Sequence, residues 1–172
     1  MSGNPIRSIR ILILFFIFGL VLSGVTAIPL ESELRAFSAI VGADRLGLSE
    51  KSGFQKWIEK VKDGVVENNL KYPFMAYGTD WLAFGHFMIA LVFVGALRDP
   101  VKNVWVIDFG IIACILTIPF ALIMGGERGI PFGWRLIDCS FGIFGMIPLL
   151  ICRRLVQRLV RSENASVLSS TF

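Results

Sequence analysis

The chain has 172 residues, of which 55% are hydrophobic and only 17% charged, with a mean hydropathy of +0.70 and a formal net charge of +4. An ordinary soluble domain is nearer half apolar and does not gather its apolar residues in long blocks. All three cysteines lie inside apolar segments, which excludes a disulfide-stapled ectodomain.

Four charge-poor segments stand out, at about 10–30, 81–97, 104–124 and 135–152. A helix rises ~1.5 Å per residue and the hydrocarbon core of a bilayer is ~30 Å thick, so each segment can cross it, the two shorter ones (81–97 and 135–152) only barely. In lipid an unpaired backbone group is expensive, so such segments cross as helices. The sequence predicts an all-α polytopic membrane protein, a single membrane domain over residues 1–172 with four transmembrane helices in a bundle.

The first segment has two interpretations. Two arginines precede its apolar core and the small residues of Val25–Ala27 follow, which is typical of a signal peptide and its cleavage site. The apolar run is longer than the core of most signal peptides, however. In addition, Gly19, Ser23 and Ala27 recur at every fourth position, a ridge that allows another helix to pack closely. We interpret the segment as a retained span, with cleavage as the alternative.

The basic residues beside the segments predict the orientation. With the N-terminus inside, the cytoplasmic face receives Arg7, Arg10, Arg98, Lys102, Arg153, Arg154, Arg158 and Arg161. By the positive-inside rule both termini are therefore cytoplasmic, with the loop 31–80 outside and the tail 153–172 inside. The expected location is a bacterial inner membrane.

The outer loop 31–80 carries two helical patterns. The first apolar series, followed by Gly42 as a stop signal, consists of Leu34, Phe37, Ile40 and Val41. The second consists of Phe54, Trp57, Ile58, Val61 and Val65, preceded by Ser52 and Gln55 at the spacing of a capping box. Two short amphipathic helices are predicted, on the lipid headgroups or capping the bundle. Acidic and basic residues nearly balance in this loop, so we expect no nucleic-acid partner.

Few ionisable residues are placed to carry chemistry. The predicted orientation brings one group near the outer membrane boundary, namely His86, Asp138, Arg135, Glu127, Arg128 and Asp80. If the second and fourth helices are neighbours, His86 and Asp138 face each other. Such a pair can move protons or hold an anionic headgroup, or it can be an internal hydrogen bond that fixes helix register.

The aspartates also have a purely structural interpretation. Asp80, Asp108 and Asp138 each lie near the N-terminal end of a predicted helix, where the free N–H groups favour a carboxylate. Thr79 or Asp80 is expected as the N-cap of the second span. Asp108 is expected within reach of Arg98 or Lys102 on the cytoplasmic side.

Cofactor and catalytic motifs are missing from the sequence. A single histidine cannot supply two axial haem ligands, and no His, Cys or carboxylate series has metal-ligand spacing. There is also no phosphate-binding loop, nucleophile elbow or Cys-x-x-Cys pair. We therefore expect no metal, no cofactor and no defined catalytic set.

These patterns favour a protein that acts by association, as an accessory or assembly subunit or as a homo-oligomer, in contact with membrane lipid. One alternative is an outer-leaflet membrane enzyme or a binder of a lipid or quinone through His86 and Asp138. A second alternative is a small ion- or proton-coupled transporter, because ionisable residues inside spans are candidates for transport.

The orientation is testable with single cysteines in a background without the native thiols. Glu50→Cys lies in the predicted outer loop and Ser166→Cys in the predicted cytoplasmic tail. An impermeant thiol reagent applied to intact cells should label position 50 and leave position 166 unlabelled until the cells are opened. Labelling of position 166 in intact cells would overturn the assignment.

Overall fold

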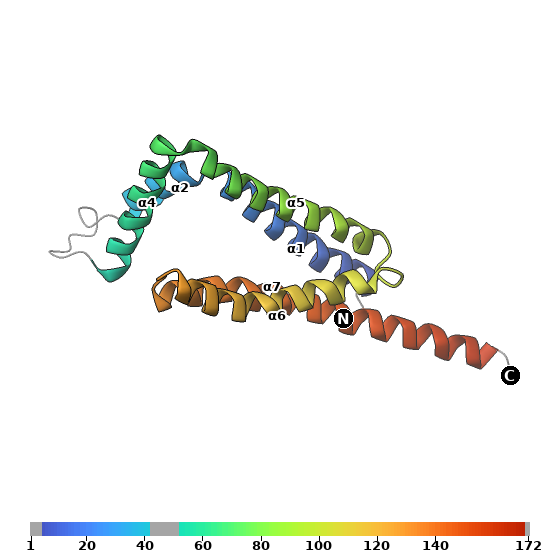
Figure 1. Cartoon of the computed structure of the whole chain (residues 1–172). Helices are drawn as coiled ribbons and strands as arrows, with labels where there is room; N and C mark the ends of the chain where they lie inside the picture. Colours follow the sequence, from blue (N-terminus) through green and yellow to red (C-terminus); the bar gives the residue numbers. More distant parts are fainter. Residues whose placement is uncertain (1–4, 42–51, 171–172) are drawn as a thin grey trace. The chain divides into compact units, whose positions relative to one another are not determined.

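The computed structural model describes residues 5–41 and 52–170, and within these residues every regular element is helical (Figure 1). In chain order the elements are α1 (Pro5–Ala27), α2 (Leu30–Val41), α4 (Gly53–Lys71), the 3₁₀ turn η1 (Pro73–Ala76), α5 (Tyr77–Arg98), α6 (Val104–Glu127) and α7 (Phe132–Ser170). The prediction of an all-α chain is confirmed for the described residues.

Four helical stretches have the length and composition of membrane spans. They are Pro5–Ala27, Pro73–Arg98, Val104–Glu127 and Phe132–Ser162. They indicate an integral membrane protein, as the sequence predicted. The arrangement of the spans as one bundle and the side on which residues 31–80 lie stay predictions.

The first span is shorter at its C-terminal end than the sequence suggested. α1 ends at Ala27, and Ile28 and Pro29 form a turn before α2 begins at Leu30. Proline disfavours helical conformation in the residue before it, so Pro29 separates α1 from α2. Because the apolar residues continue to Leu30, hydrophobicity alone does not indicate that the helix ends at Ala27.

The second span begins earlier than predicted, so the expected N-cap at Thr79 or Asp80 is wrong. Pro73 starts η1, which leads directly into α5 at Tyr77. Thr79 and Asp80 therefore lie inside the first turn of α5. The Thr79 hydroxyl donates to the Ala76 carbonyl oxygen at 2.6 Å instead of capping the helix.

The chain divides into two compact units. Unit 1 contains residues 5–19 and 89–170, and unit 2 contains residues 20–41 and 52–88. The helices α1 and α5 each contribute one part to either unit.

Unit 1 is built on the antiparallel pair α6 and α7. The turn between them contains Gly129 at φ +68°, a conformation that residues with a side chain rarely adopt. The two backbones approach closely at Gly142, where a Cβ would lie 2.6 Å from the Cys114 carbonyl oxygen. Farther along the pair, the Gly110 position is covered by the side chains of Phe93 and Leu149.

The first half of α1 packs into the same unit. Ile9 and Ile13 are fully buried, and the Cys152 thiol lies 3.7 Å from the Ile9 carbonyl oxygen. The rings of Phe16 and Phe93 are 4.7 Å apart between centroids. The start of α1 thus contacts α7, and its middle contacts α5.

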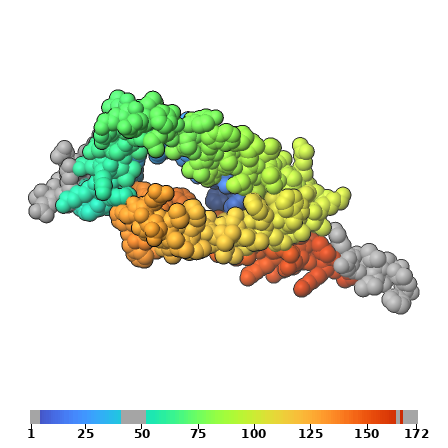
Figure 2. Space-filling model, in the orientation of Figure 1, coloured from blue at the N-terminus to red at the C-terminus, as the bar shows by residue number. Residues whose placement is uncertain are grey.

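Charged residues that flank the spans lie at the end of unit 1 that contains the α5–α6 turn. Asp108 pairs with Arg153 at 2.6 Å, so the expected pairing with Arg98 or Lys102 is wrong. The reason is that Asp108 lies on α6 beside α7, whereas Lys102 pairs with Asp99 in the α5–α6 turn at 3.6 Å. α7 continues from Arg153 as one helix to Ser170, and its later turns, in red, stand clear of α6 (Figures 1 and 2).

Unit 2 contains the helical hairpin predicted within 31–80. Gln55 N–H donates to Ser52 Oγ at 3.3 Å, and Ser52 N–H donates to Gln55 Oε1 at 2.8 Å, which confirms the capping box. The end of α2 meets the start of α4 through Phe37 and Phe54, in edge-to-face contact at 6.3 Å. Within the second apolar stripe Ile58 is only 2% exposed and packs inside the unit, whereas Phe54 is 41% exposed.

The close approach at Gly142 predicts a steric cost. Gly142→Ala would push a methyl group into the Cys114 carbonyl oxygen of α6, and overpacking of this kind costs about 1–3 kcal/mol. Gly133→Ala is the matched control, because open space surrounds that glycine of the same helix. Unfolding in detergent micelles should give a lower midpoint for Gly142→Ala only, and equal midpoints for both variants would contradict the packing.

Candidate functional site

The six predicted site residues fall into both units. His86 and Asp80 lie on α5 in unit 2, and the other four lie in unit 1, in or near the turn that joins α6 to α7. Glu127 and Arg128 are both exposed there. The proposed meeting of His86 with Asp138 joins residues of different units and stays a prediction.

Arg135 has the most elaborate surroundings of the six. Its aliphatic stem lies over Gly125, where a Cβ would come within 2.7 Å of the Arg135 Cγ and Cδ atoms. Its Nη1 donates to the Leu122 carbonyl oxygen at 3.2 Å, and its guanidinium lies 5.4 Å from the centre of the Phe132 ring. Its Nε atom is buried with no hydrogen-bond partner in the described part of the chain. Arg135 thus fastens α7 to the end of α6.

Asp138 is half-buried on α7, three residues after Arg135. It forms neither an ion pair nor a hydrogen bond with any residue in 5–41 or 52–170. Arg135 and Asp138 therefore do not form the local pair that their spacing on one helix permits.

His86 is half-buried and bonds to its own helix. Its Nδ1 lies 2.8 Å from the Leu82 carbonyl oxygen. A carbonyl oxygen only accepts, so a neutral ring holds its proton on Nδ1 and leaves Nε2 as an acceptor. The partner of His86 in this bond is thus a backbone carbonyl and not the carboxylate of Asp138.

Metal-ligating side chains do not gather among the residues that the structure describes: no group of three His, Cys, Asp or Glu residues is placed to hold an ion. Two of the cysteine thiols bond to backbone carbonyls, Cys139 to Ile118 and Cys152 to Ile9, each at 3.7 Å. These thiols join helices within unit 1.

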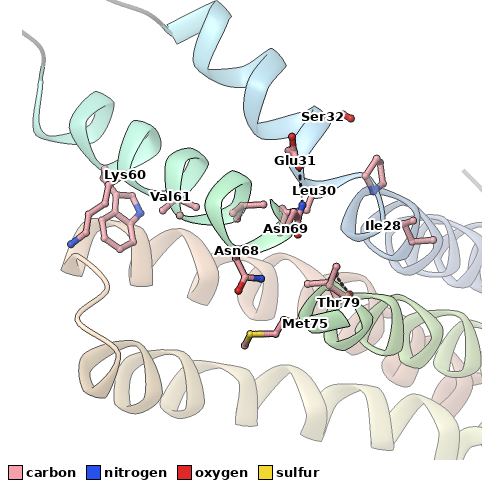
Figure 3. A pocket seen from close by; sticks show the side chains of 15 residues that line it. Ile28, Leu30, Glu31, Ser32, Lys60, Val61, Asn68, Asn69, Met75 and Thr79 are labelled. Carbon is pink, nitrogen blue, oxygen red and sulfur yellow. Dashed lines mark hydrogen bonds between the residues drawn. The ribbon is translucent and has the colours of Figure 1, made fainter. Parts of the chain in front are cut away.

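Unit 2 contains a cleft that no sequence pattern indicated (Figure 3). It has a volume of about 550 Å³ and lies between the α1–α2 turn, one face of α4, and the segment from η1 into α5. Its apolar lining includes Ile28, Leu30, Val61, Val65 and Met75. Its polar lining includes Glu31, Ser32, Trp57, Lys60, Asn68, Asn69 and Thr79.

The negative charge in this cleft is already neutralised. Glu31 accepts from Asn69 Nδ2 at 2.8 Å and from Arg35 Nε at 2.9 Å. These hydrogen bonds, the one from Asn69 first, lower the pKa of Glu31 below its ordinary 4.5. The bond to Asn69 also joins the start of α2 to the end of α4, as Figure 3 shows.

At the other end of the cleft, two hydrogen-bond donors have no acceptor among the described residues. The Trp57 Nε1–H is buried and has no acceptor among the described residues. Lys60 extends its ammonium 5.8 Å from the centre of the Trp57 ring, and no carboxylate in the described part of the chain pairs with it. Pro29 and Pro73, which end the helices around the cleft, were the sequence signals that could have indicated its position.

Comparisons with known proteins identify no relative of this chain. No protein-family model matches the chain. No curated protein and no solved structure matches it either. A proposal about function therefore depends on the contacts and chemistry of the chain's own residues.

The lowered pKa of Glu31 predicts that the α2–α4 hairpin loosens in acid. A carboxylate whose pKa is lower in the folded state stabilises that state above its unfolded pKa, and the contribution disappears as the pH falls through the folded pKa. Protection factors of the α2 and α4 amides should therefore fall below about pH 4.5.

Glu31→Gln should lower protection at neutral pH and remove this acid-dependent loss. Glu33→Gln is the matched control, because it neutralises a carboxylate in the same first turn of α2 that takes no part in the bond to Asn69. A Glu31→Gln protein with the acid response of the unmodified chain would contradict the assignment.

Proposed function

We propose that this integral membrane protein acts by association, as a homo-oligomer whose copies meet through α1. The observation that supports this is the uncovered ridge of small residues on that helix. A Cβ at Gly19 would meet nothing within 4 Å, Ser23 is exposed, and Ala27 is only half-buried.

The ridge has the spacing that helices use to pack closely in lipid. Small residues at every fourth position let two backbones approach, and van der Waals contact then drives association. Within unit 2, the close contact of α1 with α5 uses Gly24 instead, where a Cβ would lie 2.6 Å from the Phe87 ring. The ridge therefore remains for another helix, and a two-fold axis pairs it with its own copy.

This function requires α1 to stay attached to the protein. Ile9 and Ile13 are fully buried, and the Ile9 carbonyl oxygen is in contact with the Cys152 thiol. If α1 were removed as a signal peptide, Ile9 and Ile13 would be lost with it, and the surface of unit 1 against which they pack would become exposed. Both observations support the retained span over the cleaved alternative.

We also propose a bacterial inner membrane with both termini on the cytoplasmic side and α2–α4 outside. In unit 1, Arg10 at the start of α1 donates to the Arg98 carbonyl oxygen at the end of α5, at 3.3 Å. Arg153 of α7 pairs with Asp108 near the start of α6. Arg10 of α1, Arg98 of α5 and Arg153 of α7 thus lie toward one end of the unit, which agrees with the positive-inside rule.

The association is tested with two differently tagged copies in one membrane. The unmodified chain should co-purify with itself in mild detergent. Gly19→Leu should lower the co-purified fraction about tenfold, because a leucine on the ridge keeps the two backbones apart, and a loss of about 1.4 kcal/mol changes affinity tenfold. Gly85→Leu is the matched control, a helical glycine of α5 that also faces open space.

A chain that never co-purifies with itself would overturn the homo-oligomer. If it co-purified at a fixed ratio with a different membrane protein, and Gly19→Leu abolished that complex, the accessory-subunit form would replace it. Equal losses for Gly19→Leu and Gly85→Leu would remove the ridge from the interface.

A further inference from the structure

We infer that the cleft of unit 2 binds an anionic phospholipid, with its phosphate at the Trp57–Lys60 end and an acyl chain along the apolar wall. This site is separate from the α1 ridge, and none of its lining residues was singled out as a candidate for binding in the sequence. The inference depends on where the cleft lies, which polar groups are free in it, and how its polar and apolar residues are distributed.

The position of the cleft indicates an amphiphile. One wall follows directly after the last residue of α1, at Ile28 and Pro29, and a second begins at Met75, just before α5. α1 and the η1–α5 stretch are both candidate spans. The ends of two spans lie at the depth where lipid headgroups meet acyl chains, so a ligand entering there comes from the lipid.

The free polar groups of the cleft favour an anion. The carboxylate in the cleft, Glu31, accepts hydrogen bonds from Asn69 and Arg35 and is therefore not available for a cationic ligand. Trp57 and Lys60 are donors without an acceptor in the described residues. A buried N–H without a partner is rare in proteins and points to an acceptor supplied from outside the chain. A phosphate oxygen provides that acceptor and pairs with the lysine ammonium.

The distribution of residues orients the ligand. Figure 3 shows Lys60 at one end of the cleft and Ile28 at the other, and the side chains of Asn68 and Met75 directed into the space between α4 and η1. Val61 and Val65 of α4 lie along the same lining. A headgroup beside Lys60 therefore leaves the acyl chain next to valine, methionine and isoleucine side chains, where burial of apolar surface favours binding.

Gly64 offers a way to block the site. It lines the cleft, and a Cβ there would meet nothing within 4 Å. Gly64→Leu therefore adds a large apolar side chain to the lining from a backbone position that has room for a Cβ. Gly78→Leu is the matched control, since this glycine of α5 also faces open space but does not line the cleft.

The test is native mass spectrometry of the full chain in detergent, with phosphatidylglycerol or phosphatidylcholine added at equal concentration. The unmodified chain should retain one phosphatidylglycerol in preference to phosphatidylcholine. Gly64→Leu should abolish this retention, and Gly78→Leu should not. Lys60→Gln and Trp57→Phe should each weaken it about tenfold, since hydrogen bonds to charged groups are the stronger class. Trp57→Phe removes the indole N–H group and keeps an aromatic, although smaller, ring at this position.

Two surface variants and one soluble competitor complete the design. Lys56→Gln on α4 and Arg158→Gln on α7 each remove an exposed cation outside the cleft and should leave retention unchanged. Glycerol 3-phosphate should not displace the lipid, because it lacks the acyl chain. Equal retention of both lipids, full retention by Gly64→Leu, loss through Arg158→Gln alone, or displacement by glycerol 3-phosphate would each overturn the site.

Discussion

Hydrocarbon offers no hydrogen bonds to a peptide group, and this constraint organises the whole chain. Each long apolar segment is helical because only a helix satisfies its own N–H and C=O groups. Changes of direction are therefore confined to the places where a span ends. Pro29, Pro73 and Gly129 mark such places, and the cleft and the Arg135 contacts lie beside them.

Local sequence rules predicted local structure well. The capping box of Ser52 and Gln55 and the apolar face of α4 that contains Ile58 follow from spacing alone, because helical periodicity decides which side chains share a face. The ends of the spans were harder, since hydrophobicity continues through Ile28 and Leu30 although Pro29 interrupts the helix.

The sites were less predictable because side-chain partners depend on which helices are neighbours. Asp108 was expected to use a nearby cation in sequence and instead uses Arg153 of the adjacent helix, 45 residues away. Arg135 was selected for its charge, but the glycine that admits its stem lies on α6 and could not be connected to it by spacing. The cleft combines three segments whose positions follow from the α2–α4 packing, which no single pattern contains.

The length of α7 has a mechanical consequence. Its 39 residues extend about 58 Å at ~1.5 Å per residue, roughly twice the ~30 Å hydrocarbon thickness. About half of the helix therefore lies beyond the hydrocarbon core, and the Asp108–Arg153 pair joins it to α6 just before its last 17 residues. These residues form a helical extension about 25 Å long beyond the Asp108–Arg153 ion pair. A change of about 10° in helix tilt, well within the range of membrane helices, moves its free end by about 4 Å.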